Sequence, residues 1–252
     1  MTFEHLELSQ PSDGVLQIRL NRPRQFNALA GTTFVELDAA LQDFERSEER
    51  VLILTGAGRA FCFGADFQEF QDRGRLPELL RMFQSVIRRI YECPKATIAS
   101  LNGFATGAGL DLALACDLRI ASDRAKLGEA YISMGLVPDG GGSFFLPRMI
   151  GAARALKLLM TGESMDSAEA HALGLVNDVC GPEELGARTL ELAQSLASRP
   201  QTALRLVKKL VRQNAQTDLP TALNNEREAQ LLCFEDPAHL ELVREFLSKH
   251  AK

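Results

Sequence analysis

The first stretch of the sequence that could do chemistry is a glycine-rich turn with an acid beside it. In ATIASLNGFATGAGLDLALACD, residues 96–117, one short apolar run precedes the glycines and a second follows them. This order predicts a strand, a tight turn and a buried helix. A helix N-terminus has free backbone N–H groups and a partial positive charge, so the turn at Gly107 is suited to holding a negative oxygen. Asp111 falls in the first turn of that helix, near whatever is held there.

The same turn also has a purely structural interpretation. Glycines often join a strand to a helix, and an aspartate in a first helical turn is favourable on electrostatic grounds alone. The turn is not a dinucleotide fingerprint, because Leu112 stands where the third glycine of G-x-G-x-x-G would be. It does not match a P-loop either, because no Lys-Ser/Thr pair follows the glycines.

A second acid lies in a segment rich in turn residues. Residues 127–142, LGEAYISMGLVPDGGG, have little helical periodicity, and a long ordered loop of this kind is a frequent place for function. Asp139 precedes the glycines that lead into a helical pattern. It therefore either belongs to a site or caps the following helix without taking part in chemistry.

Short strands followed by helices would position these residues. VLQIRL at residues 15–20 alternates as a strand does, VLIL at 51–54 reads as a short buried strand, and a third run starts at residue 96. This recurrence indicates stacked β/α turns. Strand signals stop near residue 180 and helical spacing continues from there, so we expect an α/β core over residues 1–181 and a helical region over 182–252.

Composition excludes several classes of protein. The net charge of −5 argues against non-specific binding to nucleic acid, and no run approaches the ~18 apolar residues of a membrane span. The five cysteines form no C-x-x-C pair and the four histidines show no metal-ligand spacing, so we expect no metal site. The start, MTFEHLELSQ, does not read as a signal peptide. These features predict a reduced, cytoplasmic protein with no nucleic-acid or membrane partner.

Five segments, in this order along the chain, resemble the crotonase superfamily, the enoyl-CoA hydratase/isomerase family. They are NRPRQFNAL from Asn21, GRAFCFGADFQEF from Gly58, ATIASLNGFATGAGLDLALACDLRIAS from Ala96, KLGEAYISMGLVPDGGGSFFLPRMIG from Lys126 and MTGESMDSAEAHALGLVNDV from Met160. The resemblance implies an α/β fold, a spiral of ββα turns with a C-terminal helical trimerisation region. It also implies a homotrimer or a dimer of trimers and an acyl-CoA substrate, with coenzyme A present only as part of that substrate and no separate cofactor.

The resemblance assigns two backbone N–H groups to the thioester oxygen. By matching positions they belong to Ala65, in GAD, and Ala108, in GAG. Removing a proton beside a thioester, or adding water across the neighbouring double bond, puts negative charge on that oxygen, and each fixed donor is typically worth ~3–4 kcal/mol. Many relatives have glycine where this chain has Ala108, a change that leaves the N–H in place.

Other matching positions imply contacts with the substrate. Those implied to line the coenzyme A site or to border its adenine and pantetheine are Arg24, Phe26, Ala28, Asp66, Phe67, Gln68 and Gly107. An arginine suits a phosphate on charge grounds, although Arg24 could equally be an exposed loop residue. Near the end of the chain, Phe246 and Lys249 match positions that could contact coenzyme A, across a subunit boundary if need be.

The sequence departs from the hydratase pattern where the chemistry should be. Hydratases of the family carry two glutamates that handle one water, and here Asp111 and Tyr131 stand at those positions. A tyrosine, with a pKa near 10, replaces a carboxylate poorly, so we expect Tyr131 to be a wall of the pocket. Asp139 matches the position of the single catalytic carboxylate of several isomerases. One desolvated carboxylate can take a proton from C2 and return it at C4.

The sequence therefore favours an enoyl-CoA isomerase with Asp139 as its base and Asp111 in support. The alternatives are a hydratase that uses Asp111, an acyl-CoA hydrolase or dehalogenase with Asp139 as nucleophile, and an inactive acyl-CoA-binding protein.

Overall fold

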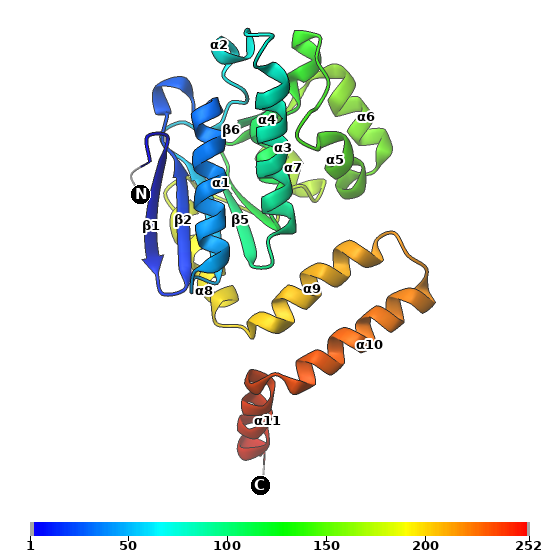
Figure 1. Ribbon diagram of the computed structural model, residues 1–252. Helices are drawn as coiled ribbons and strands as arrows, with labels where there is room; N and C mark the ends of the chain where they lie inside the picture. Colours follow the sequence, from blue (N-terminus) through cyan, green and yellow to red (C-terminus); the bar gives the residue numbers. More distant parts are fainter. Residues whose placement is uncertain (1–2, 251–252) are drawn as a thin grey trace.

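A six-stranded sheet is the larger of two sheets in the computed structural model, which describes residues 3–250 (Figure 1). Only β1 and β2 are antiparallel, and each of the other neighbouring pairs is parallel. The strands, in spatial order, are β1 (Leu6–Ser12), β2 (Val15–Leu20), β3 (Val51–Gly56), β5 (Ala96–Leu101), β7 (Leu118–Ser122) and β10 (Asp178–Cys180).

A four-stranded sheet lies beside it and receives every second strand of the middle of the chain. The chain passes from β3 to β4, from β5 to β6 and from β7 to β8, crossing between sheets each time, and a helix follows each crossing. This alternation is the spiral of ββα turns that the family resemblance implies. The strands of the smaller sheet, in spatial order, are β4 (Ala60–Cys62), β6 (Phe104–Thr106), β8 (Lys126–Gly128) and β9 (Ser164–Asp166).

Strand β3 contributes side chains to two separate hydrophobic clusters, one on each face of the larger sheet. Its alternate residues Leu52 and Leu54 join the main core under the apolar stripes of α1 (Gly31–Arg46) and α3 (Leu76–Glu92). Val51 and Ile53 point the other way and pack with α8 (Leu185–Ala197). A strand buried on both faces reads as a continuous apolar run, which explains the sequence VLIL.

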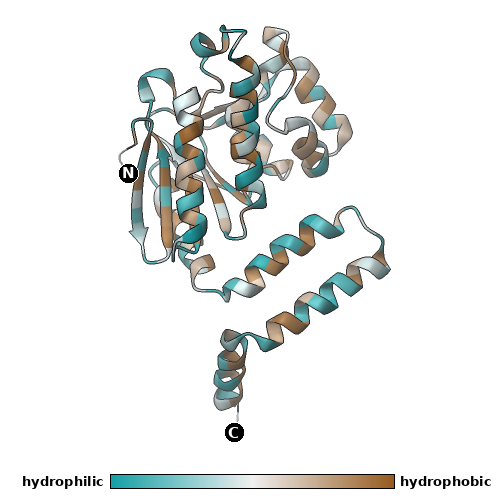
Figure 2. Ribbon diagram, in the orientation of Figure 1, coloured by the Kyte–Doolittle hydropathy of each residue, from teal (hydrophilic) through white to brown (hydrophobic). Residues whose placement is uncertain are grey.

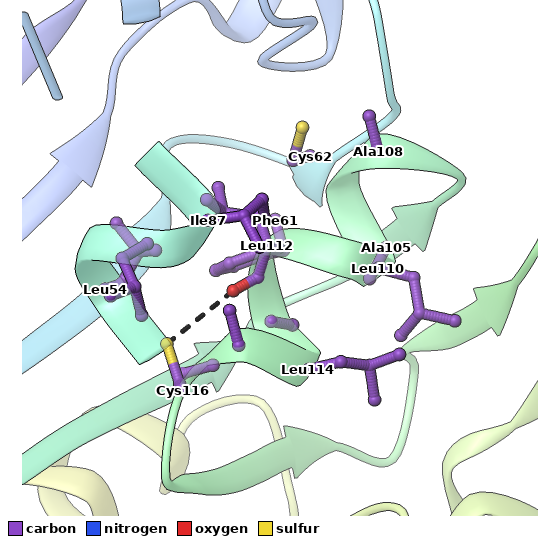
Figure 3. Packing of buried hydrophobic residues seen from close by; sticks show 14 of the residues in the cluster. Leu54, Phe61, Cys62, Ile87, Ala105, Ala108, Leu110, Leu112, Leu114 and Cys116 are labelled. Carbon is purple, nitrogen blue, oxygen red and sulfur yellow. Dashed lines mark hydrogen bonds between the residues drawn. The ribbon is translucent and has the colours of Figure 1, made fainter. Parts of the chain in front are cut away.

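Helix α4 (Ala108–Ala115) runs through the centre of the core (Figure 3). All eight of its residues are buried, and Asp111 is the single charged residue among them. A helix that is apolar all round is typical of such a central position. The remaining helical segments up to residue 172 are η1 (Pro23–Gln25), α2 (Phe67–Phe70), η2 (Ala130–Met134), α5 (Gly142–Ile150), α6 (Ala152–Thr161) and α7 (Ser167–Ala172).

The last helices project from the core. After α8, helices α9 (Gln201–Asn214), α10 (Leu219–Glu235) and α11 (Pro237–His250) extend away from the sheets (Figure 1). The predicted helical region thus contains one helix, α8, that packs on the larger sheet, and the boundary at residue 182 between two folding units stays a prediction. No helix among residues 3–250 is long and apolar enough to cross a membrane.

Many large apolar side chains on these projecting helices are exposed in the single chain. Figure 2 shows hydrophobic residues along the same helices. On α10 and α11 the exposed side chains are Leu219, Leu223, Leu231, Leu232, Phe234, Leu240, Leu242, Val243, Phe246 and Leu247. Exposed apolar surface of this extent is typical of a site of interaction with another molecule.

Ion pairs tie α9 to the core. Lys208 Nζ and Arg212 Nη2 each lie 2.7 Å from the Asp117 carboxylate, just before β7. The same carboxylate accepts a hydrogen bond from the Thr97 backbone N–H at 2.9 Å. A groove of about 440 Å³ runs beside these pairs and is lined mostly by apolar side chains, including Tyr91, Phe144, Met149, Leu204, Val207 and Val211.

We predict that Asp117→Asn lowers the free energy of unfolding by about 1–3 kcal/mol, because two cations lose their charged partner in a half-buried place. Thermal and denaturant unfolding of the variant would measure the loss. The control is Glu92→Gln, which removes the exposed pair with Arg88 at 3.9 Å and should change stability by less than about 0.5 kcal/mol. Equal effects of the two substitutions would mean that Asp117 does not anchor α9.

Candidate active site

Two backbone N–H groups come together where β4 ends and α4 begins. Gly109 packs so closely on β4 that a Cβ atom there would collide with the carbonyl oxygen of Cys62. A Cβ atom placed on Gly64 would lie 3.9 Å from the Ala108 nitrogen. Within residues 3–250, neither the Ala65 N–H nor the Ala108 N–H donates a hydrogen bond. Both are therefore available to an oxygen, and Figure 3 shows Ala108 at this end of α4.

The Tyr131 hydroxyl lies between two carboxyl groups. Its oxygen is 2.7 Å from Asp111 Oδ2 and 2.8 Å from Asp139 Oδ1. The Gly140 backbone N–H also donates to Asp111 Oδ2, at 3.2 Å. A phenol carries one hydrogen, so Tyr131 donates to one carboxyl group and can accept from the other. The prediction that Tyr131 only lines the pocket is thus incomplete, because its hydroxyl joins both candidate acids.

Burial raises the pKa of Asp111, Tyr131 and Asp139. Desolvation raises the pKa of Asp111 to about 7, and Asp139 adds to the rise. Desolvation also raises the pKa of Asp139, although this residue stays half-buried at the mouth of the cluster. The pKa of Tyr131 rises above its ordinary value through burial and the neighbouring acids, so the phenol keeps its proton. Perturbed acids gathered in one place are typical of a functional site.

Asp139 does not cap α5. The residue that caps this helix is Gly141, at φ 104°, with no side-chain hydrogen bond to the first turn. The Asp139 carboxyl instead contacts Tyr131. The prediction that Asp139 could cap this helix is therefore wrong.

Glu129 is a member of the cluster that the sequence did not reveal. Its side chain is completely buried beside Asp111. Gly142 separates the two, since a Cβ atom there would lie 2.8 Å from Asp111 Oδ1 and 2.9 Å from Glu129 Oε1. The only signal in the sequence was an acid two residues before Tyr131, and its burial could not be predicted from that spacing.

The two runs predicted to border coenzyme A lie side by side. Arg22 Nη2 bonds the Asp66 carboxylate at 2.9 Å, and Arg22 Nη1 donates to the Ala28 carbonyl oxygen at 2.6 Å. Asp66 also caps α2 by accepting from the Gln68 N–H. Its side chain thus holds the loops together, a role that spacing alone did not indicate.

Side chains along these runs face solvent. Arg24, Phe67 and Gln68 are exposed, and Phe26 is half-buried with its ring centroid 5.9 Å from that of Phe63. Gly107 packs near the Tyr131 ring, which would be 3.7 Å from a Cβ atom at the glycine. Arg22 thus joins the two predicted runs to each other, and Gly107 lies beside Tyr131 of the cluster.

Phe246 and Lys249 lie elsewhere. Both belong to α11, which in Figure 1 is at the far end of the molecule from the start of α4. Within one chain they are not part of the cluster. Among residues 3–250, no group of three or more histidine, cysteine, aspartate or glutamate side chains is arranged to hold a metal ion.

Comparison with known proteins identifies the family to which this chain is similar. Residues 10–250 match the model of the family described as enoyl-CoA hydratase/isomerase. The crystal structure of an enoyl-CoA hydratase from Bacillus anthracis superposes with a TM-score of 0.94 at 34% identity, covering 98% of this chain and 97% of the other.

Three relatives carry different activities in their names. The 1,2-epoxyphenylacetyl-CoA isomerase of Escherichia coli is 36% identical over 97% of this chain and 96% of its own. The crotonyl-CoA hydratase of Syntrophomonas wolfei is 36% identical over 99% and 97%. The 4-chlorobenzoyl coenzyme A dehalogenase-1 of an Arthrobacter species is 32% identical over 96% and 90%. With this coverage and identity, the chain belongs to the enoyl-CoA hydratase/isomerase family, the crotonase superfamily.

Proposed function

We propose that this protein shifts a carbon–carbon double bond in an enoyl-CoA, from the 3-enoyl to the 2-enoyl thioester. The observation that carries the proposal is the position of Asp139, at the mouth of the cluster with its carboxyl on Tyr131 rather than on a helix terminus. Burial raises the pKa of Asp139, and a carboxylate with a raised pKa is a stronger base at neutral pH.

The proposed reaction needs one base and one place for negative charge. Asp139 takes a proton from C2, and the electron pair moves into the thioester to give a dienolate. The N–H groups of Ala65 and Ala108 would hold the thioester oxygen as it becomes negative. The same carboxyl returns the proton to C4, which leaves the double bond between C2 and C3. The atoms balance without water or a redox partner, and coenzyme A takes part only as a component of the substrate.

Tyr131 weighs against hydration in the usual manner. Hydration by two carboxylates needs an acid and a base on one water, and Tyr131 keeps its proton. Acid–base catalysis of hydration would then depend on Asp111, whose side chain is completely buried behind the phenol.

A second candidate is nucleophilic attack by Asp139 on the substrate, as in a hydrolase or dehalogenase. The exposure of Asp139 relative to Asp111 and the dehalogenase among the relatives favour it. Incubation with 2-enoyl-CoA, 3-enoyl-CoA and 4-chlorobenzoyl-CoA separates the possibilities, since a double-bond shift, hydration, release of coenzyme A or chloride, and no change are distinct. No change with any ester would favour an acyl-CoA-binding protein without activity.

The exposed loops would bind the substrate. Arg24 on η1 suits a phosphate of coenzyme A, and Phe26, Ala28, Phe67 and Gln68 lie on the two runs that Arg22 joins. Between Tyr131 and Asp139, four exposed apolar side chains would meet an apolar acyl group: Ile132, Met134, Leu136 and Val137.

The exposed apolar faces of the projecting helices support an assembly, and the family resemblance implies that it contains three chains or two such trimers. Light scattering at micromolar concentration should give three or six times the mass of one chain, because the exposed apolar faces of α10 and α11 need a cover. Dilution series would show whether the assembly persists. A monomer at every concentration would contradict the proposal.

Replacing Ala108 with proline removes one N–H donor from the proposed oxyanion site. Ala108 is the first residue of α4, a position where proline is tolerated, so the helix should form. We predict a loss of turnover of ~10²–10³-fold. The control is Ala108→Gly, which keeps the N–H and should stay within about tenfold of the parent protein. Full activity in a folded Ala108→Pro would place the oxygen elsewhere.

Asp139→Asn tests the base. The amide is nearly isosteric but does not accept the proton, so 3-enoyl to 2-enoyl conversion should fall by about 10²–10⁴-fold. The thermal midpoint should hold, because Asp139 caps no helix. Asp166→Asn is the matched control, since Asp166 caps α7 and asparagine caps equally well.

The companion variant Asp111→Asn separates the two acids. It should lose less activity than Asp139→Asn if Asp111 only orients Tyr131. An active Asp139→Asn together with an inactive Asp111→Asn would make Asp111 the base and favour hydration. The activity of both variants should be compared at equal occupancy by coenzyme A, measured separately by calorimetry.

A further inference from the structure

The Glu129 carboxyl has no visible hydrogen-bond partner. Its side chain is 0% exposed, and neither Oε1 nor Oε2 is bonded within residues 3–250. One other buried carboxyl oxygen has the same deficiency, Asp111 Oδ1. Both Glu129 Oε1 and Asp111 Oδ1 lie within 2.9 Å of one point, the site of a Cβ atom on Gly142. The two unsatisfied oxygens are thus neighbours across this glycine.

Two ionised carboxylates would be costly here. An unpaired buried charge carries a large desolvation penalty, and like charges at short range add to it. The charged groups that act on Glu129 are Asp111 and Asp139, both acids, and the third titratable neighbour is the Tyr131 phenol. Burial and these acids raise the pKa of Glu129 well above its ordinary value. A single proton held between the two carboxyls would satisfy Asp111 Oδ1 and one of the two Glu129 oxygens.

We propose that Glu129 is a positioning residue: it is protonated, donates its proton to Asp111 Oδ1, and through Asp111 and Tyr131 strengthens Asp139 as a base. The last part rests on the proposed function, whereas the proton on Glu129 does not.

The order of hydrogen bonds follows from counting donors. Asp111, held ionised by the Glu129 O–H and the Gly140 N–H, accepts the single hydrogen of Tyr131. The Tyr131 oxygen then turns a lone pair toward Asp139, 2.8 Å away. An ionised Asp139 receives no donor from the phenol, whereas a protonated Asp139 donates to it. This asymmetry favours proton uptake by Asp139 from substrate.

Without the Glu129 donor, the order of hydrogen bonds among Asp111, Tyr131 and Asp139 would be reversed. If its donor is removed, Asp111 binds a proton itself and donates to the Tyr131 oxygen. The phenol hydrogen then points to Asp139 and stabilises its ionised form. Asp139 becomes a weaker base, with a lower pKa. The proton count of the Asp111–Tyr131 pair rises by one in this change, and no bond to carbon is altered.

Two substitutions at one position test the chain of hydrogen bonds. Glu129→Gln keeps a neutral donor toward Asp111, so the pH profile of kcat/KM should move by less than about 0.3 unit and kcat should stay within about threefold. Glu129→Leu removes the donor, so kcat should fall by about 10–100-fold while the acid limb of the profile moves to lower pH by about one unit. KM should change little in either variant, because Glu129 cannot reach the substrate.

A different result would overturn the proposal. If Glu129 were ionised, Glu129→Gln would remove a negative charge beside the acids and would itself move the acid limb to lower pH. Equal losses in Glu129→Gln and Glu129→Leu without a change in the profile would indicate a packing role only.

A measurement without substrate keeps the two proposals distinguishable. The infrared spectrum at alkaline pH should contain the carbonyl band of a protonated carboxylic acid, since ordinary carboxyls with a pKa of about 4 are ionised there. The band should vanish in Glu129→Gln and persist in Glu92→Gln, whose glutamate is exposed. Its absence from the parent protein, or its loss in Asp111→Asn but not in Glu129→Gln, would refute the proton on Glu129. If the band is present but no enoyl-CoA is isomerised, only the proposed function fails.

Discussion

The burial of carboxyl groups beside α4 is the constraint on which the rest of the structure depends. A carboxylate removed from water costs free energy unless donors meet it. Helix α4 supplies the burial, since all its residues are buried around Asp111. The loop before α5 supplies a donor, the Gly140 N–H, and a glycine at residue 142 that lets two side chains approach from either side. A larger residue at Gly142 would push Asp111 and Glu129 apart and leave both carboxyls without a shared proton.

The two-sheet spiral explains how distant residues meet at this place. β4 pairs in parallel with β6, and β6 pairs in parallel with β8, so the segments that follow these strands emerge at one edge of the smaller sheet. The first segment carries Ala65, the second carries Ala108, and the third carries Glu129 and Tyr131. The Gly107 N–H bonds the Gly128 carbonyl oxygen at 2.8 Å, which fixes the second segment against the third. Under the proposed function, the N–H groups that hold the thioester oxygen and the side chains that position the base would come from successive turns of one spiral.

Local patterns in the sequence predicted helices and strands, but they did not predict which side chains from different elements touch one another. The apolar spacing of α1 and α3, and the order of strand, turn and helix around Gly107, follow from periodicity and are confirmed. The bond from Tyr131 to both acids depends on the distance between a loop and a helix, which no local pattern records. For the same reason Asp139 looked like a possible helix cap, since its neighbours in sequence fit that role while its actual partner lies eight residues away. The burial of Glu129 could not be predicted because an acid near a strand end is usually solvated, and its approach to Gly142 of α5 is not recorded in any local pattern.

Tyr131 determines which of its two neighbouring acids receives a hydrogen bond and which is left as a free acceptor. An ionised carboxylate there would have no hydrogen to donate to Asp111 or to Asp139. A phenol with a raised pKa keeps its hydrogen and can only turn it toward one acid or the other. The buried side of the cluster therefore determines which acid faces the substrate as a free base. Because Glu129 and Asp111 are enclosed by the core while Asp139 remains half-buried, in the proposed mechanism substrate would meet Asp139, and the buried acids would act on it only through the tyrosine.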